Sequence, residues 1–403
     1  MADRIQAKTA TCSRIGRYIL LLLLVIPGFT IHAQEPTVWQ TAAQQLSQQL
    51  LEEASWALQQ EPVTVTASYS PRSAGGKHDF FSEGDYWWPN PVSADSPYIQ
   101  KDGLTNPANF TAHRLAMIRF SRIMGALASA YQLTGNRIYV LHAVKHCQAW
   151  FGDTATLMNP HLLYAQAIKG RFTGRGIGII DTIQLMEVVQ ALLVMQSSDA
   201  MDKNCYLTTQ QWFSQYLTWL TTHRYGIDEM KAENNHGTCW VMQVACFARF
   251  TNNPTLLDVC AHRYKRVLLP NQMAADGSFP RETRRTKPYG YSLFNLDAMV
   301  MICQILSTPE NDLWHYTTSD GRSIQKGIGF LYPYIKDKST WPFPKDVMYW
   351  DNWPVAQPAL LLGAAAFGEK KWLQTWTTLD HAPKEEEVIR NLPVRHPLIW
   401  LTK

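Results

Sequence analysis

The stretch HGTCWVMQVACFARF, residues 236–250, predicts a helix, and PTLLDVCAHRYKRV, residues 254–267, predicts a second helix only three residues later. Apolar side chains recur at helical spacing in both stretches, and Asn252 and Pro254 mark the break between them. A connection this short favours two helices that run antiparallel. This helix pair is the unit from which we predict the fold.

Similar helical segments with short breaks follow one another along most of the chain, whereas strand signals are scarce. Antiparallel pairs repeated about five times favour an all-α fold, an (α/α) toroid or incomplete α/α barrel, with loops and helix ends gathered at one mouth. The remaining predicted helices are approximately 37–60, 109–134, 137–151, 177–197, 208–223, 291–306, 321–335, 355–367 and 369–378.

Residues 62–107 interrupt this helical pattern. Prolines and glycines break every possible helix there, while Tyr86, Trp87 and Trp88 give the stretch apolar weight. A structureless stretch of this length in a compact domain is typically functional. We therefore expect a lid loop at the mouth, in which the three aromatic side chains either stack on a sugar or pack in the core.

The first 33 residues have the pattern of a secretory signal peptide. Arg14 and Arg17 precede a short apolar run, and Ala33 offers a small residue for cleavage. We expect a periplasmic or secreted protein with a single domain at 34–403; an uncleaved signal anchor is the alternative. The apolar run is too short to span a membrane, and we expect no other segment to be long and apolar enough to do so. After cleavage the protein is therefore expected to have no membrane partner.

Removal of this segment takes the net charge from +4 to about +1. A protein that is nearly neutral has no large net positive charge to attract nucleic acid. We predict that any polyanion binds at a local basic site. The six remaining cysteines form no CxxC pair, so any disulfide is optional, and we expect buried free thiols for the several that lie in apolar helical stretches. His142 and His146 share a helix face, but two ligands do not make a zinc site, and we predict neither a metal nor another cofactor.

The sharpest local motif is Asn234-Asn235-His236, just before an apolar helical run. Asn234 is predicted either to cap that helix or to contact a substrate. A histidine at a helix start can titrate if it faces a cleft, and the adjacent Asn235 amide can bind a carboxyl oxygen. The motif therefore indicates chemistry next to a carboxylate.

A second cluster, PRETRRTKPYGY at residues 280–291, brings Arg285, Tyr289 and Tyr291 to the start of another predicted helix. A solvated charged loop is one interpretation. The other is proton abstraction beside a carboxylate, in which an arginine offsets the charge of the carboxylate, a base takes the proton and an acid protonates the leaving oxygen. Next to Arg285, the pKa of the Tyr291 phenol is expected to fall.

Together, NNHGTCW at 234–240 and DGSFPRETRRTKPYGYSLFNLDA at 276–298 resemble the alginate lyase superfamily. The lid sequences HDFFSEGDYWWPNP at 78–91 and PYIQKDGLTNPANFTAHR at 97–114 look like its secreted bacterial branch, so the resemblance covers most of residues 60–370. It implies a toroidal lyase whose partner is an anionic polysaccharide, alginate or a related polyuronate such as glucuronan. It also implies cleavage by β-elimination, which leaves a C4=C5 unsaturated uronate.

The resemblance assigns roles residue by residue. It implies that Asn235 and Arg285 neutralise the carboxylate, that His236 is the base or its partner, and that Tyr291 is the acid and a candidate base. The interval between Arg285 and Tyr291 is one residue shorter than in the better-known members, so Tyr289 remains an alternative to Tyr291. Further cleft-lining residues suggested by the resemblance are His113, Arg114, His161, Tyr164, Gln166 and Arg175.

Two other functions fit parts of the sequence. A glycoside hydrolase on the same toroid needs two carboxylic acids across the scissile bond, for which Asp85, Glu233 and Asp297 are candidates. A non-catalytic uronate-binding protein would use arginine and aromatic side chains without needing both His236 and Tyr291.

Overall fold

Two helices, α7 (Asn235–Phe250) and α11 (Pro288–Leu306), pack against each other in the core of the computed structural model, which describes residues 35–93 and 95–401. Nearly every side chain of both helices is buried. Helices that are apolar on all sides are those that other elements surround completely. The helix predicted at residues 236–250, which is α7, is therefore an inner helix.

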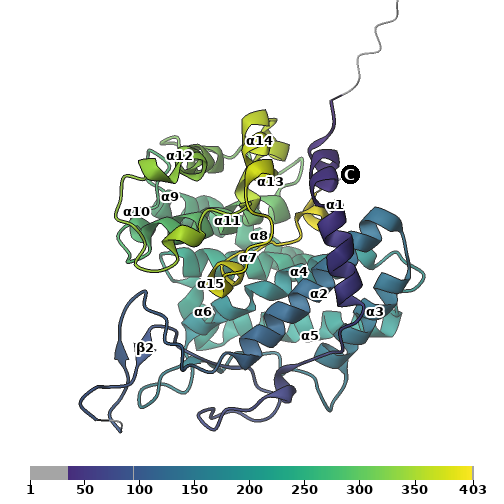
Figure 1. Cartoon of the computed structure of the whole chain (residues 1–403), viewed down its shortest axis with the longest axis vertical. Coiled ribbons are helices and arrows are strands. Elements are labelled where there is room, and N and C mark those ends of the chain that lie inside the picture. Colours follow the sequence, from purple (N-terminus) through teal and green to yellow (C-terminus); the bar gives the residue numbers. More distant parts are fainter. Residues whose placement is uncertain (1–34, 94, 402–403) are drawn as a thin grey trace, which may run out of the picture. The chain divides into compact units, whose positions relative to one another are not determined.

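A row of inner helices runs through the protein (Figure 1): α2 contacts α4, α4 contacts α7, α7 contacts α11, and α11 contacts α13. The outer helices pack against this row, and α1 also contacts α13 and α14, so the first helix meets two helices from the last part of the chain. The mostly helical α/α toroid predicted from the sequence is confirmed. The bounds are α1 Val38–Ala57, α2 Ala112–Thr134, α3 Ile138–Cys147, α4 Leu185–Met195, α5 Lys203–Thr222, α8 Pro254–Arg263, α12 Ile324–Lys336, α13 Pro358–Phe367 and α14 Lys370–Thr378.

Four short helices were not predicted: α6 (Arg224–Met230), α9 (Leu269–Gln272), α10 (Pro280–Thr283) and α15 (Glu386–Arg390). Each is at most seven residues long, which is too short to show an apolar period. The segment predicted at 177–197 begins as a 3₁₀ helix, Gly176–Gln184, before it continues as α4.

The predicted lid contains three short strands. β1 (Phe81–Glu83) pairs in parallel with β4 (Tyr164–Ala167), which ties the middle of the lid to the chain after α3. β2 (Trp87–Trp88) pairs antiparallel with β3 (Ile99–Gln100), and this hairpin projects from the helices at the lower left of Figure 1. The lid is thus anchored at β1 and extended at the hairpin.

The expectation that no segment after the N-terminal run is long and apolar enough to span a membrane was wrong. The helical stretch Gly176–Met195 has a mean hydropathy of 1.7 and is long enough to cross a membrane by length and composition alone. However, 78% of its most apolar window is buried inside the protein, as expected of a core helix. The six cysteines between residues 35 and 401 are buried and free, as predicted, whereas the predicted signal peptide lies outside the described residues.

Candidate active site

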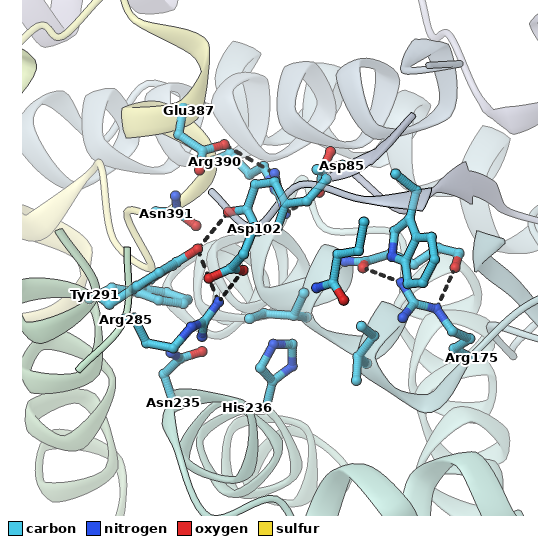
Figure 2. A pocket seen from close by; sticks show the side chains of 17 residues that line it. Asp85, Asp102, Arg175, Asn235, His236, Arg285, Tyr291, Glu387, Arg390 and Asn391 are labelled. Carbon is cyan, nitrogen blue, oxygen red and sulfur yellow. Dashed lines mark hydrogen bonds and ion pairs between the residues drawn. The ribbon is translucent and has the colours of Figure 1, made fainter. Parts of the chain in front are cut away.

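A cleft with an empty volume of about 650 Å³ opens where the lid, the first turns of α7 and α11, and α15 meet (Figure 2). Eight of the residues proposed for a lyase site line this cleft: Tyr86, Trp87, Gln166, Arg175, Asn235, His236, Arg285 and Tyr291.

The start of α7 positions His236. Asn234 takes the capping role, because its Oδ1 atom accepts a hydrogen bond from the His236 N–H at 3.3 Å. The next residue must be glycine, since a Cβ atom on Gly237 would lie 2.1 Å from the carbonyl oxygen of Ala232. The chain can therefore turn tightly enough into α7 to present the imidazole to the cleft.

The imidazole of His236 is oriented by a buried carboxylate. Its Nδ1 atom lies 2.7 Å from Oε1 of Glu229 on α6, a residue that is 1% exposed. A carboxylate only accepts hydrogen bonds, so in the neutral imidazole Nδ1 carries the proton and Nε2 carries the lone pair. This arrangement suits a general base at Nε2.

Asn235 is held by Glu282 from α10. The Asn235 N–H donates to Oε1 of Glu282 at 2.7 Å, and its Nδ2 donates to Oε2 at 2.8 Å. Burial raises the pKa of Glu282, although the two bonds from Asn235 act against that rise. One amide proton is taken by Glu282, which leaves the second for a ligand in the cleft.

Tyr291 lies in the first turn of α11 and meets the lid. Its hydroxyl is 2.6 Å from the hydroxyl of Tyr86 and 3.4 Å from Nη2 of Arg285. The Arg285 guanidinium also lies 4.4 Å from the centroid of the Tyr291 ring and forms an ion pair with Asp102 of the lid at 3.2 Å. Lid and toroid therefore share one polar cluster.

The expected fall in the pKa of Tyr291 is wrong. Burial raises the pKa of this phenol well above its ordinary value, and the neighbouring Tyr86 adds to the rise. Lys287 and Arg285 oppose the rise without overcoming it, and Arg285 shares its charge with Asp102. The Tyr291 hydroxyl is therefore protonated at neutral pH, as an acid must be.

The C-terminal segment contributes three lining residues that sequence reasoning missed: Glu387, Arg390 and Asn391. Glu387 accepts from Nζ of Lys287 at 2.5 Å and from Nη1 of Arg390 at 3.1 Å. The only signal in the sequence was a charged stretch at 384–390, and such a stretch is ordinarily a solvated face.

The three carboxylates considered for a hydrolase are unsuited to that role. Asp85 is buried, but Arg114 and Arg390 contact it at 2.8 Å each, and these charges outweigh burial and lower its pKa to about 2. Glu233 is paired with Arg281 at 2.7 Å, and neither Glu233 nor Asp297 lines the cleft. None of these three carboxylates is therefore placed to form the acid–base pair across the cleft that a hydrolase requires.

Four residues suggested by the resemblance lie behind the cleft rather than on its lining. His113 accepts from the Phe81 N–H through Nδ1 at 3.0 Å and donates from Nε2 to the Ser68 carbonyl at 2.9 Å, which fastens the lid to α2. Arg114 is 4% exposed and committed to Asp85. His161 lies 3.4 Å from Asp79 and packs edge-on against Tyr164. The structure gives these side chains supporting positions.

Tyr289 and Trp88 also lie away from the cleft. Tyr289 is fully buried, and its hydroxyl donates to the carbonyl oxygen of Tyr334 at 2.9 Å. Trp88 donates from Nε1 to the Leu104 carbonyl at 2.9 Å and carries the ammonium of Lys101 over its ring. Neither side chain can reach a sugar beside Tyr291 without leaving these partners.

The wall opposite α11 is aromatic and cationic. The Trp87 ring lies beneath the guanidinium groups of Arg171 and Arg175, at 5.3 and 5.8 Å from its centroid. Arg175 donates from Nε to the carbonyl of Gln166 at 2.9 Å, and burial lowers its pKa to about 10. Gln166 has a φ of +48°, a left-handed conformation that side-chain-bearing residues seldom adopt and that clusters at functional sites.

His142 and His146 have a structural explanation. Both Nε2 atoms contact the carbonyl oxygen of Gln60, at 3.0 and 3.1 Å. Within residues 35–93 and 95–401, no group of three or more histidine, cysteine, aspartate or glutamate side chains could hold a metal ion.

Comparison with known proteins supplies the family. The sequence profile described as Alginate lyase matches residues 64–341. The chain is 32% identical to an alginate lyase from Bacteroides ovatus of known structure, over 89% of this chain and 94% of that one, with a TM-score of 0.77. No curated protein matches the chain.

More distant structures share the fold alone. Alginate lyase A1-III from Sphingomonas species A1 is 17% identical over 84% of this chain and 89% of that one, with a TM-score of 0.54. A histidine-to-alanine variant of A1-III in complex with a tetrasaccharide is 15% identical over 80% of this chain and 88% of that one, also with a TM-score of 0.54. From the profile match and the Bacteroides structure together, the chain belongs to the alginate lyase family of polysaccharide lyases.

Proposed function

We propose that this protein cleaves alginate or a related polyuronate, such as glucuronan, by β-elimination. The observation that carries the proposal is one cleft that holds a carboxylate-oriented imidazole, a protonated phenol and a guanidinium: His236, Tyr291 and Arg285. The tetrasaccharide complexes of the Sphingomonas enzyme variants support an oligosaccharide as the ligand.

In the proposed reaction the carboxylate of the reacting uronate lies against Arg285 and the amide of Asn235. Neutralising that carboxylate makes the C5 proton removable, because the enolate that develops is held by fixed donors. Arg285 must then share its guanidinium between Asp102 and the substrate, or release Asp102.

Two separate residues complete the elimination. We assign the base to His236, whose Nε2 lone pair takes the C5 proton, and the acid to Tyr291. The electrons of the C5–H bond form the C4=C5 double bond, the C4–O4 bond breaks, and O4 receives the hydroxyl proton of Tyr291. The raised pKa of Tyr291 supports the acid role and argues against this phenol as the base.

Absorbance tests the proposal. The protein is incubated with polymannuronate, polyguluronate and glucuronan while ultraviolet absorbance and reducing ends are followed. A lyase yields new reducing ends together with the absorbance of a conjugated C4=C5 bond. Reducing ends without absorbance would indicate hydrolysis, and binding without either product would indicate a binding protein.

We also propose that the protein acts outside the cytoplasm, after removal of residues 1–33. The support is the pattern of that segment, in which basic residues precede an apolar run, as in a secretory signal peptide. An enzyme must also be located where its polymer substrate occurs. Cell fractionation with N-terminal sequencing of the mature protein tests this. A cytoplasmic protein that retains Met1 would contradict it.

A further inference from the structure

Lys287 is a buried lysine that faces aromatic rings. Its side chain is 5% exposed, and its Nζ atom lies 5.1 Å from the ring centroid of Tyr86, 5.2 Å from that of Tyr291 and 5.2 Å from that of Tyr349. Lysine is almost never buried unless it is paired, and Glu387 is the carboxylate partner, at 2.5 Å. Aromatic ring faces attract such a cation.

The N-cap position of α11 holds Lys287 close to Tyr291. The Tyr291 N–H donates to the Lys287 carbonyl at 3.1 Å, so the backbone of the cap residue is tied to the first turn of the helix. The ammonium lies 5.2 Å from the centroid of the Tyr291 ring, beside the phenol. On its other side Glu387, itself bonded to Arg390, holds the ammonium in place.

We propose that Lys287 is a positioning residue for the acid step, in which its ammonium offsets the negative charge left on Tyr291. The inference rests on the proposed function. In that step the O–H bond of Tyr291 breaks, its proton joins O4 as the C4–O4 electron pair moves onto O4, and a phenolate remains until solvent reprotonates it. A phenolate in a buried site is costly, so a fixed cation nearby is worth more there than in water.

The electrostatics of the cluster support separate roles for Lys287, which acts on the Tyr291 phenol, and Arg285, which acts on the substrate carboxylate. Burial raises the pKa of Tyr291, and Lys287 opposes that rise more strongly than Arg285 does. Burial alone would lower the pKa of Lys287, but Glu387 and Tyr291 outweigh it and keep the ammonium charged. Arg285 is engaged with Asp102 and, in the proposed reaction, with the substrate carboxylate, whereas Lys287 has neither task.

The test compares two leaving groups. Lys287→Met, which keeps the length of the side chain without its charge, is assayed on an oligouronate and on a uronate that carries fluoride at C4. Fluoride departs without a proton, so its elimination does not need the acid. Lys287→Met should lose about 10- to 100-fold in turnover on the oligouronate and much less on the fluoride. An equal loss on both substrates would overturn the inference, because it would show a general structural defect.

Two further variants separate the possible causes. Lys287→Met/Glu387→Gln removes both charges of the pair, so no buried carboxylate is left without its lysine partner, and the contrast between substrates should persist. Recovery of oligouronate turnover would assign Lys287 a purely structural role. Lys338→Met is the matched control, because Lys338 also lies over an aromatic ring, 4.7 Å from the Trp350 centroid, but away from the cleft. It should keep both activities.

Tyr291→Phe distinguishes failure of the inference about Lys287 from failure of the proposed function. It should show the same contrast between the two leaving groups as Lys287→Met. If Tyr291→Phe shows the contrast and Lys287→Met does not, the inference fails while the proposed function stands. If the wild-type protein eliminates neither leaving group, the proposed function itself is wrong.

Discussion

The Nδ1 atom of His236 lies 2.7 Å from Oε1 of Glu229, and that glutamate comes from a different helix, α6, that the sequence did not reveal. The pair fixes which nitrogen of the imidazole carries a proton. It therefore makes the activity of His236 depend on a residue that is too buried to touch substrate.

Glu229→Gln should reduce turnover by about 10- to 100-fold, because the amide no longer fixes the imidazole tautomer as the carboxylate does. Turnover is measured by the absorbance of the unsaturated product, with circular dichroism to confirm folding. Activity at the wild-type level in a folded Glu229→Gln protein would show that the carboxylate of Glu229 is not needed to orient His236.

Arg285→Ala should lose about 10²-fold or more in turnover, on the scale of deleting one oxyanion donor. The guanidinium is the group that offsets the substrate carboxylate, and its loss also frees Asp102 as an uncompensated anion in the cleft. Asp102→Asn in the same background removes that second effect. Near wild-type turnover in Arg285→Ala would reject the neutralising role.

Tyr291→Phe and Tyr289→Phe should behave in opposite ways. Tyr291→Phe deletes the proposed proton donor and should cost 10² to 10⁴ in turnover, roughly the range for general acid catalysis, while oligosaccharide still binds. Tyr289→Phe leaves the Tyr334 carbonyl without its buried donor, so it should cost about 1–3 kcal/mol of stability and little turnover. The reverse pattern would show that Tyr289 is the acid.

Trp87→Ala should weaken polymer binding more than Trp88→Ala. Trp87 lines the cleft beneath Arg171 and Arg175, whereas Trp88 lies outside the lining. The Michaelis constants of the two variants for the polymer measure the difference, and melting temperatures report packing. A large drop in melting temperature with an unchanged Michaelis constant in Trp87→Ala would favour core packing instead.

His396 should make stability fall at alkaline pH. It is buried between Glu187, 3.0 Å from Nδ1, and Glu53, 3.2 Å from Nε2, and although burial opposes its charge, these carboxylates raise its pKa to about 9. A raised pKa in the folded state means that this contribution is full below the unfolded value of about 6.5 and is lost as pH rises through about 9.

Melting temperature measured across pH 6 to 10 checks this prediction. His396→Gln should flatten the alkaline decline and lower the melting temperature at neutral pH. His315→Gln is the control, since His315 is exposed and pairs with the exposed Asp312. A wild-type decline that His396→Gln leaves unchanged would show that other groups cause it.

Local chemistry in the sequence determined the helices, the all-α class and the two motifs of the site. Apolar spacing and short breaks depend only on neighbouring residues, so α7 and α11 were predicted to within three residues at either end. Asn235, His236, Arg285 and Tyr291 lie at or near the first turns of these two helices, which explains why the motifs alone located them.

Tertiary structure decided the partners and the charges. Glu229, Glu282 and Glu387 act on His236, Asn235 and Lys287 from three short helices without a detectable period, and no spacing rule connects them. Tertiary packing also buries Tyr289 in the core and raises the pKa of Tyr291. The physical reason is that burial and ion pairing depend on distances in space, where residues more than two hundred positions apart, such as Tyr86 and Tyr291, meet. Desolvation of the Tyr291 phenol therefore outweighs the charge of Arg285, which is closer in the sequence.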